Sequence, residues 1–101
     1  MRYMIVKEIN KPGCLISTKE CKNFKSGYVI LGKGEVIGKH KTGDGEEILI
    51  ILEGIARIIV EKEIALVESP ATVLIPPNTL HSVENDSEKT LKYVYIVANG
   101  K

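Results

Sequence analysis

The chain has 101 residues, of which 44% are hydrophobic and 27% charged, and its formal net charge is +1. This length supports one domain around one core, and the composition is that of a globular rather than a disordered protein. The balanced charge offers no basic surface, so we expect neither nucleic acid nor a membrane as a partner.

The apolar runs are short, and the run over residues 48–52 has the length of a strand. A membrane-spanning helix needs about 20 apolar residues. The N-terminus reaches Lys7 before the apolar core of a secretion signal develops, and Cys14 and Cys21 match no metal or redox spacing. We therefore expect a cytoplasmic protein with reduced thiols.

Short runs of β-branched and aromatic residues, separated by Gly, Pro, Asn and Asp, are typical of strands. In chain order they predict strands over 2–9, 14–18, 28–34, 35–41, 46–52, 55–60, 64–67, 72–75, 81–85 and 92–98. The polar segment 18–26 is either a loop or one short helix. Many short strands at this spacing predict an all-β fold, as an antiparallel sandwich or barrel.

The strand predicted at 35–41 directs one of the two histidines inward. Alternation of side chains places His40 on one face with Val36 and Thr42. The opposite face carries Ile37 and the charged Lys41, which marks it as the outside. A histidine inside an apolar barrel needs partners for its ring nitrogens, so His40 is a candidate for a functional residue.

The strand predicted at 46–52 is apolar on both faces, so we expect it to be covered by N-terminal strands or by a second subunit. Glu47 shares a face with Leu49 and Ile51, whereas Glu46 lies on the other face as a solvated strand-end charge. An unpaired carboxylate inside would cost several kcal/mol, so Glu47 should be matched by a cation or neutralised.

These positions lie in two motifs that resemble those of the cupin superfamily. The first family motif, G-x5-H-x-H-x(3,4)-E-x6-G, reads here Gly34-x5-His40-x-Thr42-x4-Glu47-x6-Gly54. The second, G-x5-P-x-G-x2-H-x3-N, reads Pro70-x5-Pro76-x-Asn78-x2-His81-x3-Asn85. The resemblance implies one cupin domain over residues 1–101, a double-stranded β-helix or jelly-roll barrel with N-terminal strands packed on its outside.

The resemblance also implies a metal site. Carried over residue by residue, the ligands are His40, Glu47 and His81, a set that suits Fe, Mn, Ni or Zn. Thr42 stands where the family has a second histidine, and its hydroxyl could hold a metal-bound water. Asn78 replaces a glycine and suits the left-handed conformation of a turn. In the metal-free alternative, His40 and Glu47 form a hydrogen-bonded pair and His81 closes the barrel mouth.

Three further side chains are candidates for lining a pocket. Tyr93 and Tyr95 share one face of the last strand, where each is either a hydroxyl donor to a ligand or a core tyrosine. Arg57 binds an anionic group if it points inward. Otherwise it lies on the outer face or makes an ion pair between subunits.

The function implied by the resemblance is a metal-dependent small cupin that binds or acts on a small polar metabolite, as a sugar-isomerase-like or dioxygenase-like enzyme. The alternative is a non-enzymatic sensor of a small ligand, with a degenerate or empty metal site. A third reading is a structural dimer with a vestigial pocket. No residue is assigned a catalytic role. Because strands apolar on both faces would expose hydrophobic patches, we expect a homodimer.

Overall fold

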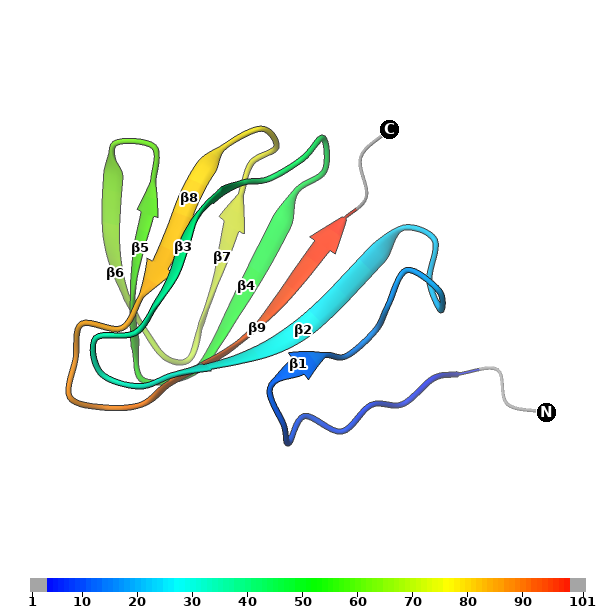
Figure 1. Ribbon diagram of the computed structural model, residues 1–101, viewed down its shortest axis with the longest axis horizontal. Helices are drawn as coiled ribbons and strands as arrows, with labels where there is room; N and C mark the ends of the chain where they lie inside the picture. Colours follow the sequence, from blue (N-terminus) through cyan, green and yellow to red (C-terminus); the bar gives the residue numbers. More distant parts are fainter. Residues whose placement is uncertain (1–3, 99–101) are drawn as a thin grey trace.

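The structure is a computed structural model that describes residues 4–98. Those residues form strands and no helix (Figure 1), which confirms the predicted all-β class. The strands are β1 (Gly13–Cys14), β2 (Phe24–Leu31), β3 (Val36–Lys41), β4 (Glu47–Glu53), β5 (Ile55–Val60), β6 (Glu63–Glu68), β7 (Ala71–Ile75), β8 (Leu80–Glu84) and β9 (Leu91–Ala98). The described residues contain no helix that could cross a membrane.

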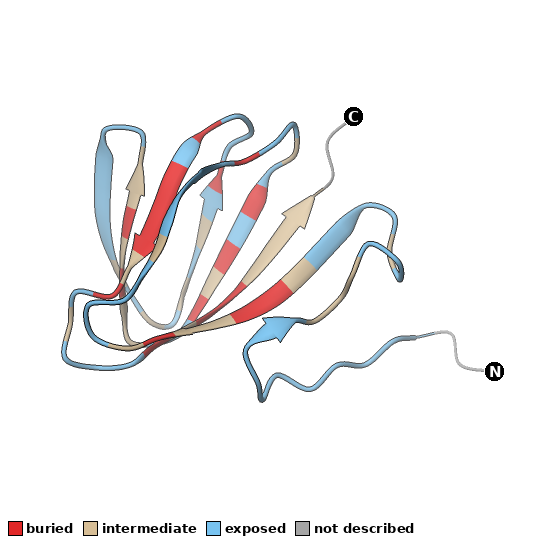
Figure 2. Ribbon diagram, in the orientation of Figure 1, coloured by how far each residue is buried: buried red, intermediate tan, exposed pale blue. Residues whose placement is uncertain are grey.

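The strands form two antiparallel sheets, with the orders β1-β2-β9-β4-β7 and β3-β8-β5-β6. Strands that follow one another in sequence mostly lie in different sheets, which is the arrangement of a jelly-roll barrel (Figure 1). Buried residues alternate with more exposed ones along most of β4 and at the start of β5 (Figure 2). The core between the sheets includes Leu49, Ile51, Ala56, Ile58, Ile75, Val83 and Leu91.

The N-terminal part differs from the prediction. Residues 2 and 3 of the strand predicted at 2–9 lie outside the described residues, and residues 4–9 form no strand. The residues of β1 pair with β2 at the sheet edge, directly after Pro12, which has no amide hydrogen for a ladder. Ile5 and Val6 instead line a groove on the outer face of the larger sheet, opposite Ile50 and Leu52.

The polar segment predicted over residues 18–26 ends earlier in the structure, at residue 23. It contains turns and no helix up to residue 23, so the loop alternative is correct there. Strand β2 then begins at Phe24, four residues before the predicted start, because its first residues pair with the end of β9. This longer strand brings Lys25 into the sheet.

Three residues of the motifs hold backbone conformations with positive φ, namely Gly34 (81°), Gly54 (87°) and Asn78 (54°). A Cβ atom at Gly54 would overlap the carbonyl oxygen of Thr90, so only glycine fits the turn between β4 and β5. Asn78 takes the left-handed conformation that its replacement of glycine predicted. The turns that carry the motifs are therefore formed in the usual way despite the substitutions.

A β-bulge in β3 corrects the predicted alternation. Ile37 lies opposite Val83 of β8, and His40 lies opposite His81, so three steps along β3 match two along β8. The additional residue reverses the alternation within the strand. Ile37 therefore packs against the core, whereas Val36 is 54% exposed, so the prediction that Val36 shares the inner face of His40 is wrong.

Candidate metal centre

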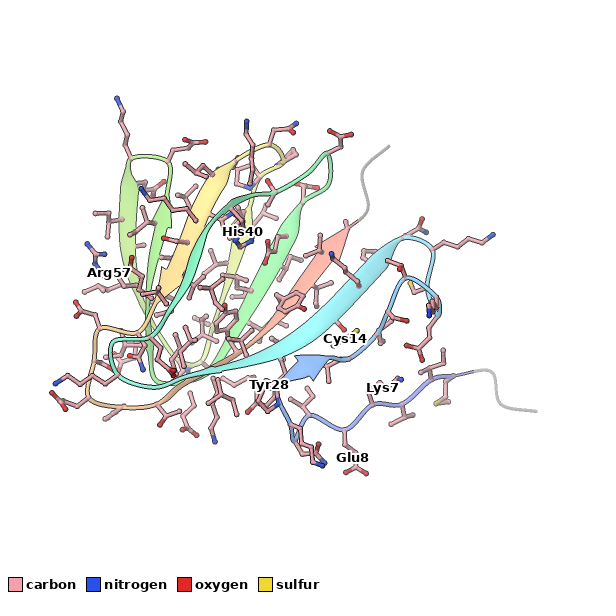
Figure 3. The ribbon with its side chains drawn as sticks, in the orientation of Figure 1. Lys7, Glu8, Cys14, Tyr28, His40 and Arg57 are labelled. Atoms are coloured by element: carbon pink, nitrogen blue, oxygen red, sulfur yellow. The ribbon has the colours of Figure 1, made fainter. Side chains whose placement is uncertain are left out.

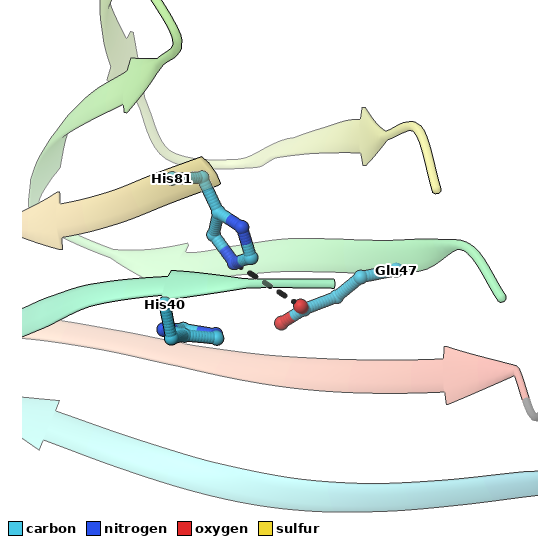
Figure 4. A group of neighbouring side chains, drawn as sticks. All are labelled: His40, Glu47 and His81. Carbon is cyan, nitrogen blue, oxygen red and sulfur yellow. Dashed lines mark ion pairs between the residues drawn. The ribbon is translucent and has the colours of Figure 1, made fainter. Parts of the chain in front are cut away.

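Three side chains from different strands converge at one end of the barrel (Figure 4). His40 of β3, Glu47 of β4 and His81 of β8 each offer a ligand atom, and these atoms lie within 4.8 Å of one another. The two histidines face each other across the β3–β8 ladder, with ring centroids 4.1 Å apart. Because Glu47 comes from the other sheet, only the closure of the barrel brings it to them.

The backbone sets the orientation of both imidazole rings. Nδ1 of His81 lies 3.2 Å from the carbonyl oxygen of Thr79, and Nδ1 of His40 lies 3.2 Å from that of Gly38. A carbonyl oxygen only accepts hydrogen bonds, so Nδ1 is the protonated nitrogen in each ring. In the neutral imidazole this leaves the lone pair on Nε2, as in the usual arrangement of a metal-ligating histidine.

Nε2 of His81 is the most informative atom of the site. It lies 3.2 Å from Oε1 of Glu47, in a side chain that is 2% exposed, and no described residue gives it a hydrogen bond of acceptable geometry. A lone pair and a carboxylate oxygen that face each other repel unless a positive charge lies between them. A metal ion would supply that charge, as would protonation of the imidazole.

Ligands of one ion at about 2.0–2.2 Å are roughly 3–4 Å apart, so the separation between His81 and Glu47 suits a shared ion. His40 is exposed at the barrel mouth and has room to adjust. The metal-free alternative expected a pair of His40 with Glu47 and placed His81 at the barrel mouth. In the structure the positions of the two histidines are reversed, because Glu47 pairs with a buried His81 and His40 lies at the mouth. The donor set and the geometry fit a divalent transition metal.

Thr42 lines the cavity, but its hydroxyl contacts the backbone. Its hydroxyl donates to the carbonyl oxygen of Pro76 at 2.8 Å and accepts from the amide of Thr79 at 2.9 Å. The one hydroxyl proton is thereby used, so the hydroxyl can contact a metal-bound water only as an acceptor, through its second lone pair. Thr42 instead ties the end of β3 to the turn before β8, and the carbonyl of Thr79 in that turn holds the ring of His81.

A cavity of about 360 Å³ opens in front of His40 and Glu47. Tyr93 and Tyr95 line it from β9, the strand between β2 and β4. Burial, followed by the negative charge of Glu47, raises the pKa of Tyr93 well above its usual range. Burial is also the largest cause that raises the pKa of Tyr95. Both phenols are therefore neutral at physiological pH and can donate hydrogen bonds into the cavity.

Arg57 lies away from this cavity, on the outer face of the smaller sheet (Figure 3). Alternation along β5 buries Ala56 and Ile58, so the side chain between them points outward. There Arg57 pairs with Glu84 of β8 at 2.7 Å. Of the alternatives for this residue, the structure therefore has the position on the outer face, and the ion pair lies within the chain.

Two lysines at the mouth of the cavity were not among the sequence candidates. Lys25 of β2 and Lys41 at the end of β3 both line it. Lys25 would have emerged from alternation had the strand been extended back from residue 28, because it precedes Gly27 and Val29 on one face. Alternation placed Lys41 on the face opposite His40, and the bulge does not change this because it lies between Ile37 and His40. Lys41 lines the cavity from the end of the strand.

Comparison with known proteins supports the same fold. The sequence profile of the cupin domain matches residues 27–97. A protein of Methanocaldococcus jannaschii described as uncharacterised is 32% identical over 88 residues, which cover 87% of this chain and 67% of that protein.

Two solved structures are similar in fold. A predicted oxalate decarboxylase of Thermotoga maritima has a TM-score of 0.82 at 17% identity, with 93% of this chain and 98% of the other covered. An RmlC-like cupin family protein of M. jannaschii, with a double-stranded β-helix fold, has a TM-score of 0.83 at 19% identity, with 97% and 93% covered. At such identities the likeness concerns the fold alone. With the profile matched across most of the chain, this protein belongs to the cupin domain family.

Proposed function

We propose that this cupin binds one divalent transition-metal ion, from among Fe, Mn, Ni and Zn, through His40, Glu47 and His81. The observation that carries the proposal is the buried Nε2 of His81, which faces Glu47 at 3.2 Å without a hydrogen bond from the described residues. Two imidazoles with one carboxylate are a common transition-metal ligand set, and three protein ligands leave positions open for a substrate.

The cavity beside the three residues is the place for a small polar metabolite. Its volume of about 360 Å³ is at the lower end of ligand pockets in proteins. The bound ion would supply Lewis acidity or oxygen chemistry, as in the isomerase-like and dioxygenase-like activities that the family resemblance implies. Tyr93 and Tyr95 would orient the metabolite through their hydroxyls.

A second candidate function is a non-enzymatic sensor that holds a small ligand without a metal. The observation that favours it is the same contact, because a protonated His81 and an ionised Glu47 at 3.2 Å would form an ion pair without a metal. The absence of a fourth protein ligand at Thr42 would then reflect loss of the metal.

The metal content of protein purified without chelators separates the two candidates. We expect close to one ion per chain by elemental analysis, and loss of the ion in His81→Ala and Glu47→Gln variants. Glu46→Gln is the matched control, because Glu46 is the exposed neighbour of Glu47 and carries the same charge. Metal-free protein that neither retains nor takes up Fe, Mn, Ni or Zn would contradict the proposal and favour the sensor.

We further propose that the protein forms a homodimer. Apolar side chains on the outer face of the larger sheet and in the N-terminal segment are exposed, including Ile5 (51%), Val6 (64%), Ile48 (40%) and Leu52 (46%). Exposed apolar residues that gather in one groove are typical of a protein interface.

A further inference from the structure

We propose that the ligand of the cavity is a small carboxylate, recognised by Lys25 and Lys41 at the mouth and by the tyrosine hydroxyls inside. The proposal deepens the proposed function, since it names the class of metabolite. The proposal rests on the proposed function in one respect, because a bound metal ion would contribute part of the affinity for the ligand. The contribution of the two lysines does not depend on the metal.

The strand register places Lys25 in line with the candidate metal centre. Lys25 of β2 pairs with Val97 of β9, and Val97 pairs on its other side with Glu47 of β4. Residues paired in this way point to the same face of a sheet, and two strand spacings amount to about 10 Å. Lys25 and Glu47 therefore lie at opposite sides of the cavity floor, with Val97 between them.

Lys41 adds a second positive charge from the opposite sheet, directly after His40. Among the described residues, neither Lys25 nor Lys41 takes part in an ion pair, whereas Lys7, Lys33 and Lys92 each have an acidic partner. Glu47 is the only carboxylate among the described residues that line the cavity. The lining is thus positively charged without a metal and more so with one, which favours an anionic ligand.

The remaining lining favours a carboxylate over a phosphate. Many phosphate sites are built from backbone amide groups at a helix N-terminus. The described residues that line this cavity belong to no helix. They offer instead two ammonium groups and two phenol hydroxyls, together with the apolar side chains of Val29 and Val97. A short carbon chain with a carboxylate matches these donors and this wall.

Gly27 gives the cavity its phenol donor. It lies opposite Tyr95 in the β2–β9 ladder, and a Cβ atom at this position would overlap the Tyr95 ring and hydroxyl. The missing side chain therefore allows the ring and hydroxyl of Tyr95 to lie against the backbone of β2 at Gly27.

The test is calorimetric titration of malonate into the zinc-loaded and the metal-free protein, beside malonamide, its neutral analogue, and inorganic phosphate. We expect malonate to bind at least tenfold more tightly than malonamide in both forms. The double variant Lys25→Gln/Lys41→Gln should weaken malonate binding about tenfold without changing the zinc content. Lys39→Gln is the matched control, because Lys39 lies in β3 but lines a different hollow, and it should bind malonate as the original protein does.

Failures of the two proposals are distinguishable. Stoichiometric zinc with equal binding of malonate and malonamide, or with an unchanged double variant, would overturn the carboxylate assignment alone. Tighter binding of phosphate than of malonate would overturn it as well. Protein that takes up none of Fe, Mn, Ni and Zn but prefers malonate in a lysine-dependent way would support the ligand class and refute the metal site.

Discussion

Thr42→Val tests whether the residue that replaces the second motif histidine is structural. Valine has nearly the same shape and keeps the branched Cβ, so the change removes only the hydroxyl. Thr42 is 5% exposed, and its hydroxyl makes two hydrogen bonds, of 2.8 Å to the carbonyl of Pro76 and 2.9 Å from the amide of Thr79. The substitution therefore leaves a buried amide and a carbonyl without their partner.

The cost can be worked out from these contacts. Each hydrogen bond contributes about 1 kcal/mol, and an unsatisfied buried donor costs a further ~1–3 kcal/mol. The added methyl group recovers about 0.8 kcal/mol at most. We expect the free energy of unfolding to fall by about 2–4 kcal/mol, which for a chain of this length is a decrease in Tm of roughly 8–32 °C.

The assay is urea unfolding of the metal-free protein, followed by circular dichroism, so that stability is measured apart from metal binding. Thr72→Val is the control, because the hydroxyl of Thr72 donates one bond to the carbonyl of Leu49 at 3.0 Å from an exposed position. It should cost about 0.5 kcal/mol or less. A Thr42→Val protein as stable as the Thr72→Val protein would refute the positioning role.

Three further predictions follow from the packing, the pKa values and the exposed surface. Gly27→Ala should lower the free energy of unfolding by about 1–3 kcal/mol by displacing Tyr95, whereas Gly43→Ala, where a Cβ atom meets nothing within 4 Å, should be close to neutral in the same urea assay. Because folding raises the pKa of Tyr93 and Tyr95, the folded state holds protons that the unfolded state loses above pH ~10. Stability should therefore be unaffected by these groups below that pH and fall above it. Phenolate absorbance should show that Tyr93 and Tyr95 lose their protons only when the protein unfolds. Loss of these protons near pH ~10 in the folded protein would contradict the prediction. In sedimentation equilibrium at micromolar concentration, the unaltered protein should have twice the chain mass of 11.1 kDa, and the Leu52→Glu variant should have the mass of one chain. A monomeric unaltered protein would refute the dimer.

Regular strands were predictable because their pattern is local. Strand β5 has the predicted bounds, and alternation along β4 correctly placed Glu47 inside and Glu46 outside. In such strands each side chain is related to its neighbours by the two-residue period alone. The turns at Gly54 and Asn78 were predictable for a similar reason, since their residue types match the positive φ that they adopt.

Errors arose where pairing with a distant strand overrides the local pattern. The bulge in β3 depends on β8, which lies more than 40 positions further along the chain, and it exchanged the faces of Val36 and Ile37. Likewise, the start of β2 depends on the end of β9, and this hid Lys25 from the sequence analysis. No short stretch of sequence contains the information for either register.

The sequence by itself determined the all-β class, the positions of most strands and the chemical types at the site: two imidazoles and one carboxylate. The tertiary structure alone decided which atoms meet. It paired Glu47 with His81 rather than with His40, committed the Thr42 hydroxyl to the turn before β8, and brought two lysines to the cavity mouth. The physical reason is that residue types and periods are local properties, whereas ring orientation, proton positions and charge at the site depend on contacts between strands far apart in the chain.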